Sequence, residues 1–122
     1  MHKDEVTCLL DLSNGDIVSG SLDTTIKIWD HSNGKCKWTL KGHTHAVIVL
    51  LELSDGHLVS SALDQTIVIW DISSGTIFNT LEGFEHPISQ MVKLPNDLIA
   101  MNCNETFFLI WEGIATEKKE NL

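Results

Sequence analysis

The feature that most constrains this chain is a repeat of 41 residues that ends in Trp-Asp or a close variant. Residues 17–30 read IVSGSLDTTIKIWD, and residues 58–71 read LVSSALDQTIVIWD. The two copies end at Trp29 and Trp70, each followed by aspartate, and Trp111 follows after a further 41 residues. A fixed period of this length is typical of repeat architectures, so the repeat has to be interpreted before any other feature.

Within one repeat, the pattern predicts four short antiparallel strands. In the first copy the strand candidates are residues 6–12, 17–22, 25–29 and 35–40. Apolar and polar residues alternate in the third candidate, as expected when the two faces of a sheet have different surroundings. The sequence Ser-Asn-Gly-Asp between the first two candidates is typical of a tight hairpin turn.

The second copy, residues 43–83, has 21 identities in 41 aligned positions with residues 2–42. Shared composition cannot produce such agreement. Residues 84–122 form a third, diverged copy that keeps the apolar rhythm but loses most identities. Its tail, residues 117–122, is charged and is either an exposed fourth strand or frayed.

Composition places the chain among globular proteins and excludes several classes of partner. Its 122 residues fit one domain that can bury a core without disulfides or metals. The net charge of −9 opposes binding to nucleic acid or to anionic membranes. No apolar run is long enough to span a bilayer and no secretory signal is visible, so we expect an intracellular protein, cytoplasmic or nuclear.

Four neighbouring lysines, Lys27, Lys35, Lys37 and Lys41, fit the solvated faces of strands.

The stretches SGSLD and SSALD, the pair Gly42-His43 and the two Trp-Asp endings resemble the WD40 repeat of β-propellers over nearly the whole chain. The resemblance implies an all-β fold with three propeller blades of four antiparallel strands each, at about residues 2–42, 43–83 and 84–122.

In the WD40 family, four side chains of each blade form a hydrogen-bonded tetrad. Carried over by position, the resemblance implies two such tetrads: His2, Ser19, Asp23 and Trp29, and then His43, Ser60, Asp64 and Trp70. A buried carboxylate and a buried indole N–H are both tolerated when they find partners. The third repeat has Phe84, Met101 and Glu105 at these places and keeps only Trp111, so we expect this blade to be the softest.

A recurring Ser, His and Asp also suggests a catalytic triad. A catalytic site occurs once, however, and this set recurs at a structural period, so we expect no enzyme activity and no catalytic residue. The histidines at positions 43, 45, 57 and 86 lack the close spacing and the Cys or carboxylate partners of zinc sites. We therefore expect no metal and no cofactor.

The expected function is protein–protein interaction through the loop faces of the propeller. The resemblance implies contacts from the loop before the first strand and from the turn before the tetrad aspartate. By position the candidate residues are Asp4, Glu5, Leu22, Thr44, His45, Leu63, Glu85, His86 and Asn104. An ordinary turn residue is the alternative for each of them. Trp38, which has no aromatic counterpart in the second repeat, is either a local packing residue or a contact residue.

Three blades cannot close a ring, and an open arc exposes an apolar flank at each end. Either the chain is a building block of a larger propeller, or copies of it join head to tail. Two copies give six blades, inside the usual range, and three give nine, outside it. We therefore expect a C2 homodimer rather than a trimer.

Overall fold

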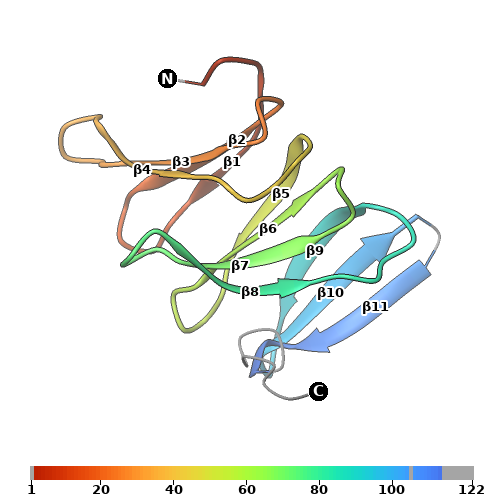
Figure 1. Ribbon diagram of the computed structural model, residues 1–122. Helices are drawn as coiled ribbons and strands as arrows, with labels where there is room; N and C mark the ends of the chain where they lie inside the picture. The colour runs from red at the N-terminus through yellow and green to blue at the C-terminus, as the bar shows by residue number, and fades with distance from the viewer. Residues whose placement is uncertain (1, 105, 114–122) are drawn as a thin grey trace.

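The computed structural model describes residues 2–104 and 106–113 and contains three antiparallel sheets that lie side by side (Figure 1). Sheet I consists of β1 (Val6–Asp11), β2 (Ile17–Ser21), β3 (Ile26–Trp29) and β4 (Cys36–Leu40). Sheet II consists of β5 (Val47–Glu52), β6 (Leu58–Ala62), β7 (Ile67–Asp71) and β8 (Thr76–Leu81). Sheet III consists of β9 (Ile88–Leu94), β10 (Leu98–Cys103) and β11 (Thr106–Trp111).

The all-β fold class is confirmed, and the strands of each sheet are consecutive in the chain. The possible fourth strand of the last sheet, residues 117–122, lies outside the described residues. Within the part of the chain that is described, no helix has the length and hydropathy needed to cross a membrane.

The core lies between the sheets. Sheet I contributes Val18 and Ile28 to one apolar cluster, which also contains Leu58 and Trp70 of sheet II. A second cluster joins the opposite face of sheet II to sheet III. Each inner sheet surface is therefore covered by its neighbour, which is how propeller blades bury their alternating apolar residues.

The outer face of sheet I has no such cover among the described residues. We call this face the back flank and define it by Leu9, Ile17, Lys27 and Trp29, which the pairing register places on one side of the sheet. Leu9 is 69% exposed, whereas its counterpart Leu50, which faces sheet I, is 8% exposed. The contrast shows how much burial a further blade would supply.

Strand β11 departs from the repeat in its register. Sheets I and II pair Ile17 with Trp29 and Leu58 with Trp70, so the period predicts that Ile99 pairs with Trp111. Instead Trp111 lies opposite Leu98, and Ile99 lies opposite Ile110. A shift by one residue turns every side chain of a strand to the other face.

The shift places Trp111 on the face of sheet III that points away from sheet II, where it is 52% exposed. Phe107, Leu109 and Val92 share this face by register and are all more than half exposed. We call these four residues the front flank. The expectation that Trp111 keeps the place of Trp29 and Trp70 is therefore wrong.

Two glutamates that the repeat pattern did not single out tie neighbouring sheets together. Ser13 donates from its backbone N–H and its hydroxyl to the carboxylate of Glu52, with distances of 2.9 and 3.0 Å. Ser54, the counterpart of Ser13, donates in the same way to Glu112. The serines obey the period, and the glutamates do not, so alignment of the repeats alone could not pair them.

Candidate functional site

The two expected tetrads are brought together with nearly the same geometry. In sheet I, His2 Nε2 lies 2.6 Å from Ser19 Oγ, and Trp29 Nε1 donates to the same oxygen at 2.9 Å. His2 Nδ1 lies 3.1 Å from an oxygen of Asp23. In sheet II the corresponding distances among His43, Ser60, Asp64 and Trp70 are 2.7, 2.7 and 3.0 Å.

The donors and acceptors of a tetrad fit a chain of hydrogen bonds that runs from the indole to the aspartate. The indole N–H of Trp70 can only donate, so the oxygen of Ser60 accepts it and the Ser60 hydroxyl donates to His43 Nε2. His43 then carries its proton on Nδ1 and donates to Asp64. The chain of bonds therefore ends on the carboxylate of Asp64, whose pKa is lowered.

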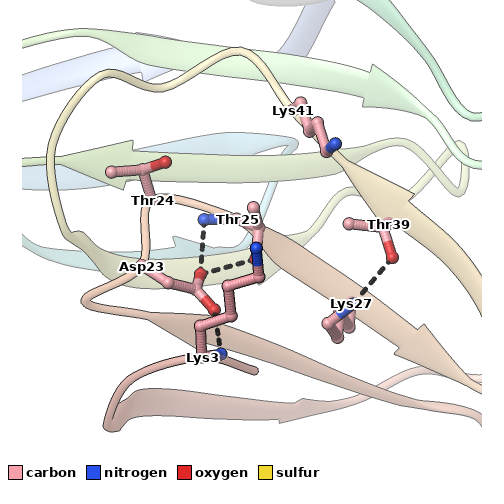
Figure 2. Close-up of a pocket in the computed structure, with 7 residues that line it drawn as sticks. All are labelled: Lys3, Asp23, Thr24, Thr25, Lys27, Thr39 and Lys41. Atoms are coloured by element: carbon pink, nitrogen blue, oxygen red, sulfur yellow. Dashed lines mark hydrogen bonds between the residues drawn. The ribbon is translucent and has the colours of Figure 1, made fainter. Parts of the chain in front are cut away.

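Each aspartate of the tetrads also anchors the turn between the second and third strands. Asp23 accepts from the backbone N–H groups of Lys3 and Thr25 and from the Thr25 hydroxyl (Figure 2). Burial alone would raise the pKa of Asp23, but the bonds from Thr25, the Lys3 N–H and His2 outweigh it and hold the pKa well below its usual range. Asp64 has the matching partners, and its pKa is also lowered.

The order Ser–His–Asp within hydrogen-bonding distance is also that of a catalytic triad, but the surroundings differ. Ser60 is fully buried and Ser19 is 3% exposed. Each hydroxyl oxygen also accepts an indole N–H inside the sheet, so it lacks the access that a nucleophile needs. The arrangement is that of a structural network inside each sheet.

The third repeat has no comparable network among its described residues. Met101 is buried in the core, and Phe84 packs edge-on against Phe108 with ring centres 5.9 Å apart. Trp111 is displaced by the register shift, and Glu105 lies outside the described residues. Packing between side chains therefore replaces hydrogen bonds at this position of sheet III.

The candidate partner-contact residues lie in loops and turns at one end of the sheets. All nine are exposed: Asp4, Glu5, Leu22, Thr44, His45, Leu63, Glu85, His86 and Asn104. The backbone N–H of Leu22 donates to the carbonyl of Glu5, and that of Leu63 donates to the carbonyl of Ala46. The loop before the first strand and the turn before the aspartate are thus joined in the same way in sheets I and II.

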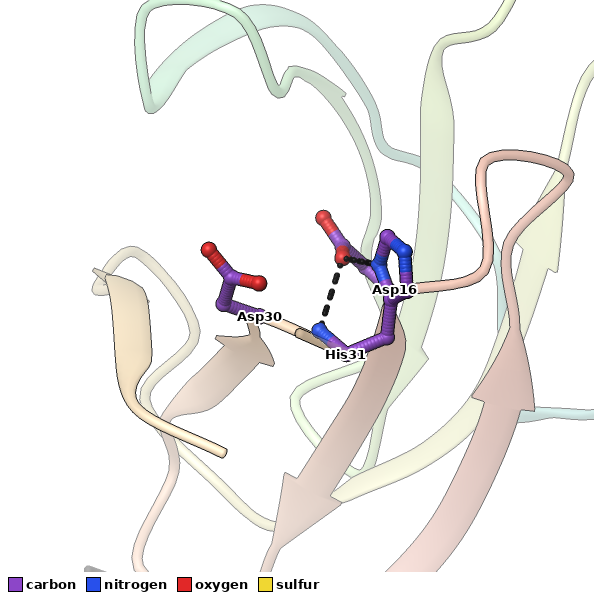
Figure 3. A group of neighbouring side chains, drawn as sticks. All are labelled: Asp16, Asp30 and His31. Atoms are coloured by element: carbon purple, nitrogen blue, oxygen red, sulfur yellow. Dashed lines mark hydrogen bonds and ion pairs between the residues drawn. The ribbon is translucent and has the colours of Figure 1, made fainter. Parts of the chain in front are cut away.

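A cluster that sequence reasoning missed lies at the other end of sheet I, where Asp16, Asp30 and His31 offer side-chain atoms that could hold a metal ion (Figure 3). Asp16 is buried, and its two oxygens are already engaged by His31 Nδ1 at 2.6 Å and by Lys37 Nζ at 2.8 Å. An ammonium group at this distance disfavours a further cation. The cluster is better described as an ion-paired clamp.

The bonds from His31 and Lys37 hold the pKa of Asp16 well below its usual range. In sheet II the counterparts of Asp16 and Lys37 are His57 and Phe78, whose rings lie 4.4 Å apart. The same place is thus held by charge in one sheet and by ring packing in the next. Lys37 is therefore more than a solvated strand residue, contrary to the expectation from sequence.

The Trp38 ring packs against sheet II at Gly75, in the turn between β7 and β8. The two are so close that a Cβ atom at Gly75 would lie 2.5 Å from the ring. Gly75 also has a φ of +71°, which glycine adopts at least cost. Trp38 therefore has a local packing role, and 37% of the residue is still exposed.

Comparison with known proteins gives one consistent family. Residues 1–30 and 34–71 match the family described as WD40, "WD domain, G-beta repeat". A segment of 46 residues, 38% of this chain, is 52% identical to 4% of the F-box/WD repeat-containing protein 7 of Drosophila melanogaster. A segment of 47 residues is 51% identical to 10% of the nuclear distribution protein nudF of Aspergillus flavus.

Among solved structures, the WD40 β-propeller domain of Doa1 superposes with a TM-score of 0.79 and 26% sequence identity. The match covers 88% of this chain and 36% of that chain. The present chain therefore spans about a third of that propeller chain and a tenth or less of the relatives named above.

Proposed function

The chain belongs to the WD40 repeat family, and we propose that it is a non-catalytic protein-interaction module. The observation that carries the proposal is the repeated pair Leu22 and Leu63, which are 41% and 50% exposed. Each leucine is held in a defined turn by a bond to the loop before the first strand. Exposed leucines on rigid turns are suited to binding rather than to packing within the chain.

The residues around the two leucines define the chemistry of the partner. Asp4 and Glu5 lie beside Leu22, and Glu85 lies in the corresponding loop of the third repeat. Exposed leucines with acidic residues in the adjoining loops fit a peptide that carries both apolar and basic residues. We place this interaction inside the cell, in the cytoplasm or the nucleus.

The leucine pair gives the first test. A variant with Leu22→Glu and Leu63→Glu should lose at least about tenfold in partner capture, because each change places a charge in an apolar contact. The control variant, Asn33→Glu plus Ser74→Glu, adds the same charge at exposed turns of the opposite end. Quantitative pull-down followed by mass spectrometry compares the two. Partners retained equally by both variants would contradict the proposal.

We also propose that the back flank and the front flank cover each other in a head-to-tail C2 dimer of six blades. Support comes from the exposed apolar side chains at both ends of the arc, among them Leu9 and Trp111. A trimer of nine blades exceeds the usual size of a propeller. Lys27 on the back flank is less favourable for this closure than the valine at the same place in sheet II.

Sedimentation at micromolar concentration tests the dimer, which should have twice the mass of the chain. A stable, compact monomer would contradict it. The alternative function, a structural building block of a larger propeller without a binding role of its own, is favoured by the same exposed flanks. It predicts an isolated chain that aggregates or is partly unfolded.

A further inference from the structure

A pocket of about 460 Å³ lies at the outer side of sheet I (Figure 2). Its walls come from four segments of the chain: the residues before β1, the turn between β2 and β3, strand β3, and the end of β4. Three lysines and three threonines line it: Lys3, Lys27, Lys41, Thr24, Thr25 and Thr39. The remaining lining residue is Asp23.

The lysines of this pocket have no ion-pair partner among the described residues. A lysine does form an ion pair elsewhere in the described residues: Lys37 pairs with Asp16, at the other end of the sheet. Lys27 Nζ donates to the Thr39 hydroxyl at 2.9 Å, which is a neutral acceptor. Asp23 keeps its negative charge while its oxygens accept from backbone N–H groups, from Thr25 and from His2. Three lysines and one carboxylate therefore leave the lining with a net positive charge.

Comparison of the repeats separates this pocket from the scaffold. Sheet II keeps the structural residues Asp64, Thr66 and Thr80 at the places of Asp23, Thr25 and Thr39. The three lysines, in contrast, are replaced by Thr44, Val68 and Glu82. The positive charge is therefore unique to the first repeat, and the fold itself does not need it.

The charge stands out against the rest of the chain. Three of its eight basic residues line one pocket, although the whole chain has a net charge of −9. Unpaired ammonium groups and hydroxyls at a hollow are donors for oxyanions. The volume exceeds that of a single carboxylate or phosphate group, and the lysines approach from different segments, which suits several oxyanions on one extended ligand.

We propose that this lysine pocket binds an acidic segment of a partner protein through oxyanions of that segment. The oxyanions are carboxylates of Asp or Glu, or phosphate groups on Ser or Thr, and the two sources share the same recognition chemistry. The pocket adjoins the Leu22 turn, because Asp23 and Thr24 line it, but it prefers the opposite charge and so adds a second type of contact to the proposed module. It shares Lys27 with the back flank, so it is fully open only where no second copy covers that flank.

Fluorescence anisotropy with two labelled peptides tests the pocket, one rich in glutamate and serine and the other carrying phosphoserine in place of that serine. A triple variant replaces each lysine by its counterpart in the second repeat: Lys3→Thr, Lys27→Val and Lys41→Glu. Because sheet II folds with these residues at the same places, we expect the variant to fold. We expect it to weaken binding at least about tenfold. The binding of the unmodified protein should also weaken as salt rises from about 0.05 to 0.3 M.

The control variant, Lys35→Glu plus Lys93→Glu, changes the net charge by the same amount at exposed sites outside the pocket. Sedimentation of both variants checks that neither substitution changes the oligomeric state. The single change Lys41→Glu lies outside the back flank, and it should also weaken peptide binding. The tighter of the two peptides identifies the oxyanion. The proposal is overturned if neither peptide binds at about 1 mM, or if the control weakens binding as much as the triple variant. Neither outcome would bear on the leucine pair.

Discussion

Replacing Trp70 with alanine should lower the free energy of unfolding by about 3–5 kcal/mol, the range for removing a buried tryptophan. The side chain is 1% exposed and packs between sheets I and II. Its indole N–H also donates to Ser60 at 2.7 Å. The variant therefore loses apolar burial, leaves a cavity and removes the first donor of the tetrad.

Trp111 offers a matched control, because it is the same residue type at the same place in the repeat. The register of β11 leaves it 52% exposed. At protein concentrations where the front flank is uncovered, Trp111→Ala should therefore cost less than about 1 kcal/mol. The comparison isolates the effect of burial from that of residue type.

Urea unfolding followed by far-ultraviolet circular dichroism measures both changes at one protein concentration, without relying on tryptophan fluorescence. If Trp70→Ala proves unfolded in buffer, Trp70→Phe, which keeps a ring but loses the N–H, provides a milder change in the same direction. Equal costs for Trp70→Ala and Trp111→Ala would show that β11 follows the register of the other sheets. That result would contradict the structure of sheet III described above.

The period of 41 residues was sufficient to predict the tetrads by position. A residue that recurs in phase occupies an equivalent place when the turns around it also recur. This holds for Ser19 and Ser60, because both lie before a turn that an aspartate and a threonine close with the same hydrogen bonds. Local turn chemistry and long-range period then agree.

The same reasoning failed for Trp111 because the turn changed while the spacing did not. The third repeat lacks the Asp-x-Thr sequence, and its hairpin is tight, with Cys103 paired to Thr106. The period fixes the number of residues, but the turn fixes which face each residue takes. The missing Asp-x-Thr sequence was the available warning.

The lysine pocket and the clamp around Asp16 were harder to predict for a different reason. Their members come from separate segments and do not recur, so no pattern along the chain joins them. The substitution of Lys27 for the valine of the second repeat is a visible signal. That substitution alone does not indicate a site. Lys3 and Lys41 complete the pocket, and they meet Lys27 only when sheet I has folded.

Replacing Asp64 with alanine should lower the free energy of unfolding by about 3 kcal/mol, since buried donors left without acceptors each cost about 1–3 kcal/mol. Asp64 accepts from His43, whose side chain is fully buried, and from the N–H groups of Thr44 and Thr66 and the Thr66 hydroxyl. Asp71→Ala is the control. Asp71 accepts from Ser73 in an exposed turn, and its loss should cost about 1 kcal/mol or less.

The pH dependence of the same protein tests the charge of the tetrad. Because the pKa of Asp64 is lowered in the folded state, its ionised form stabilises the fold above the unfolded-state pKa of about 4. That contribution is lost as the pH falls through the folded-state value. Urea unfolding below about pH 4 should therefore show a smaller loss of stability for Asp64→Asn than for the unmodified protein. The other aspartates with a lowered pKa, among them Asp16 and Asp23, account for the loss that remains. Parallel curves for the two proteins would mean that Asp64 acts in the tetrad by shape alone, and the chain of bonds from Trp70 would then need no ionised end.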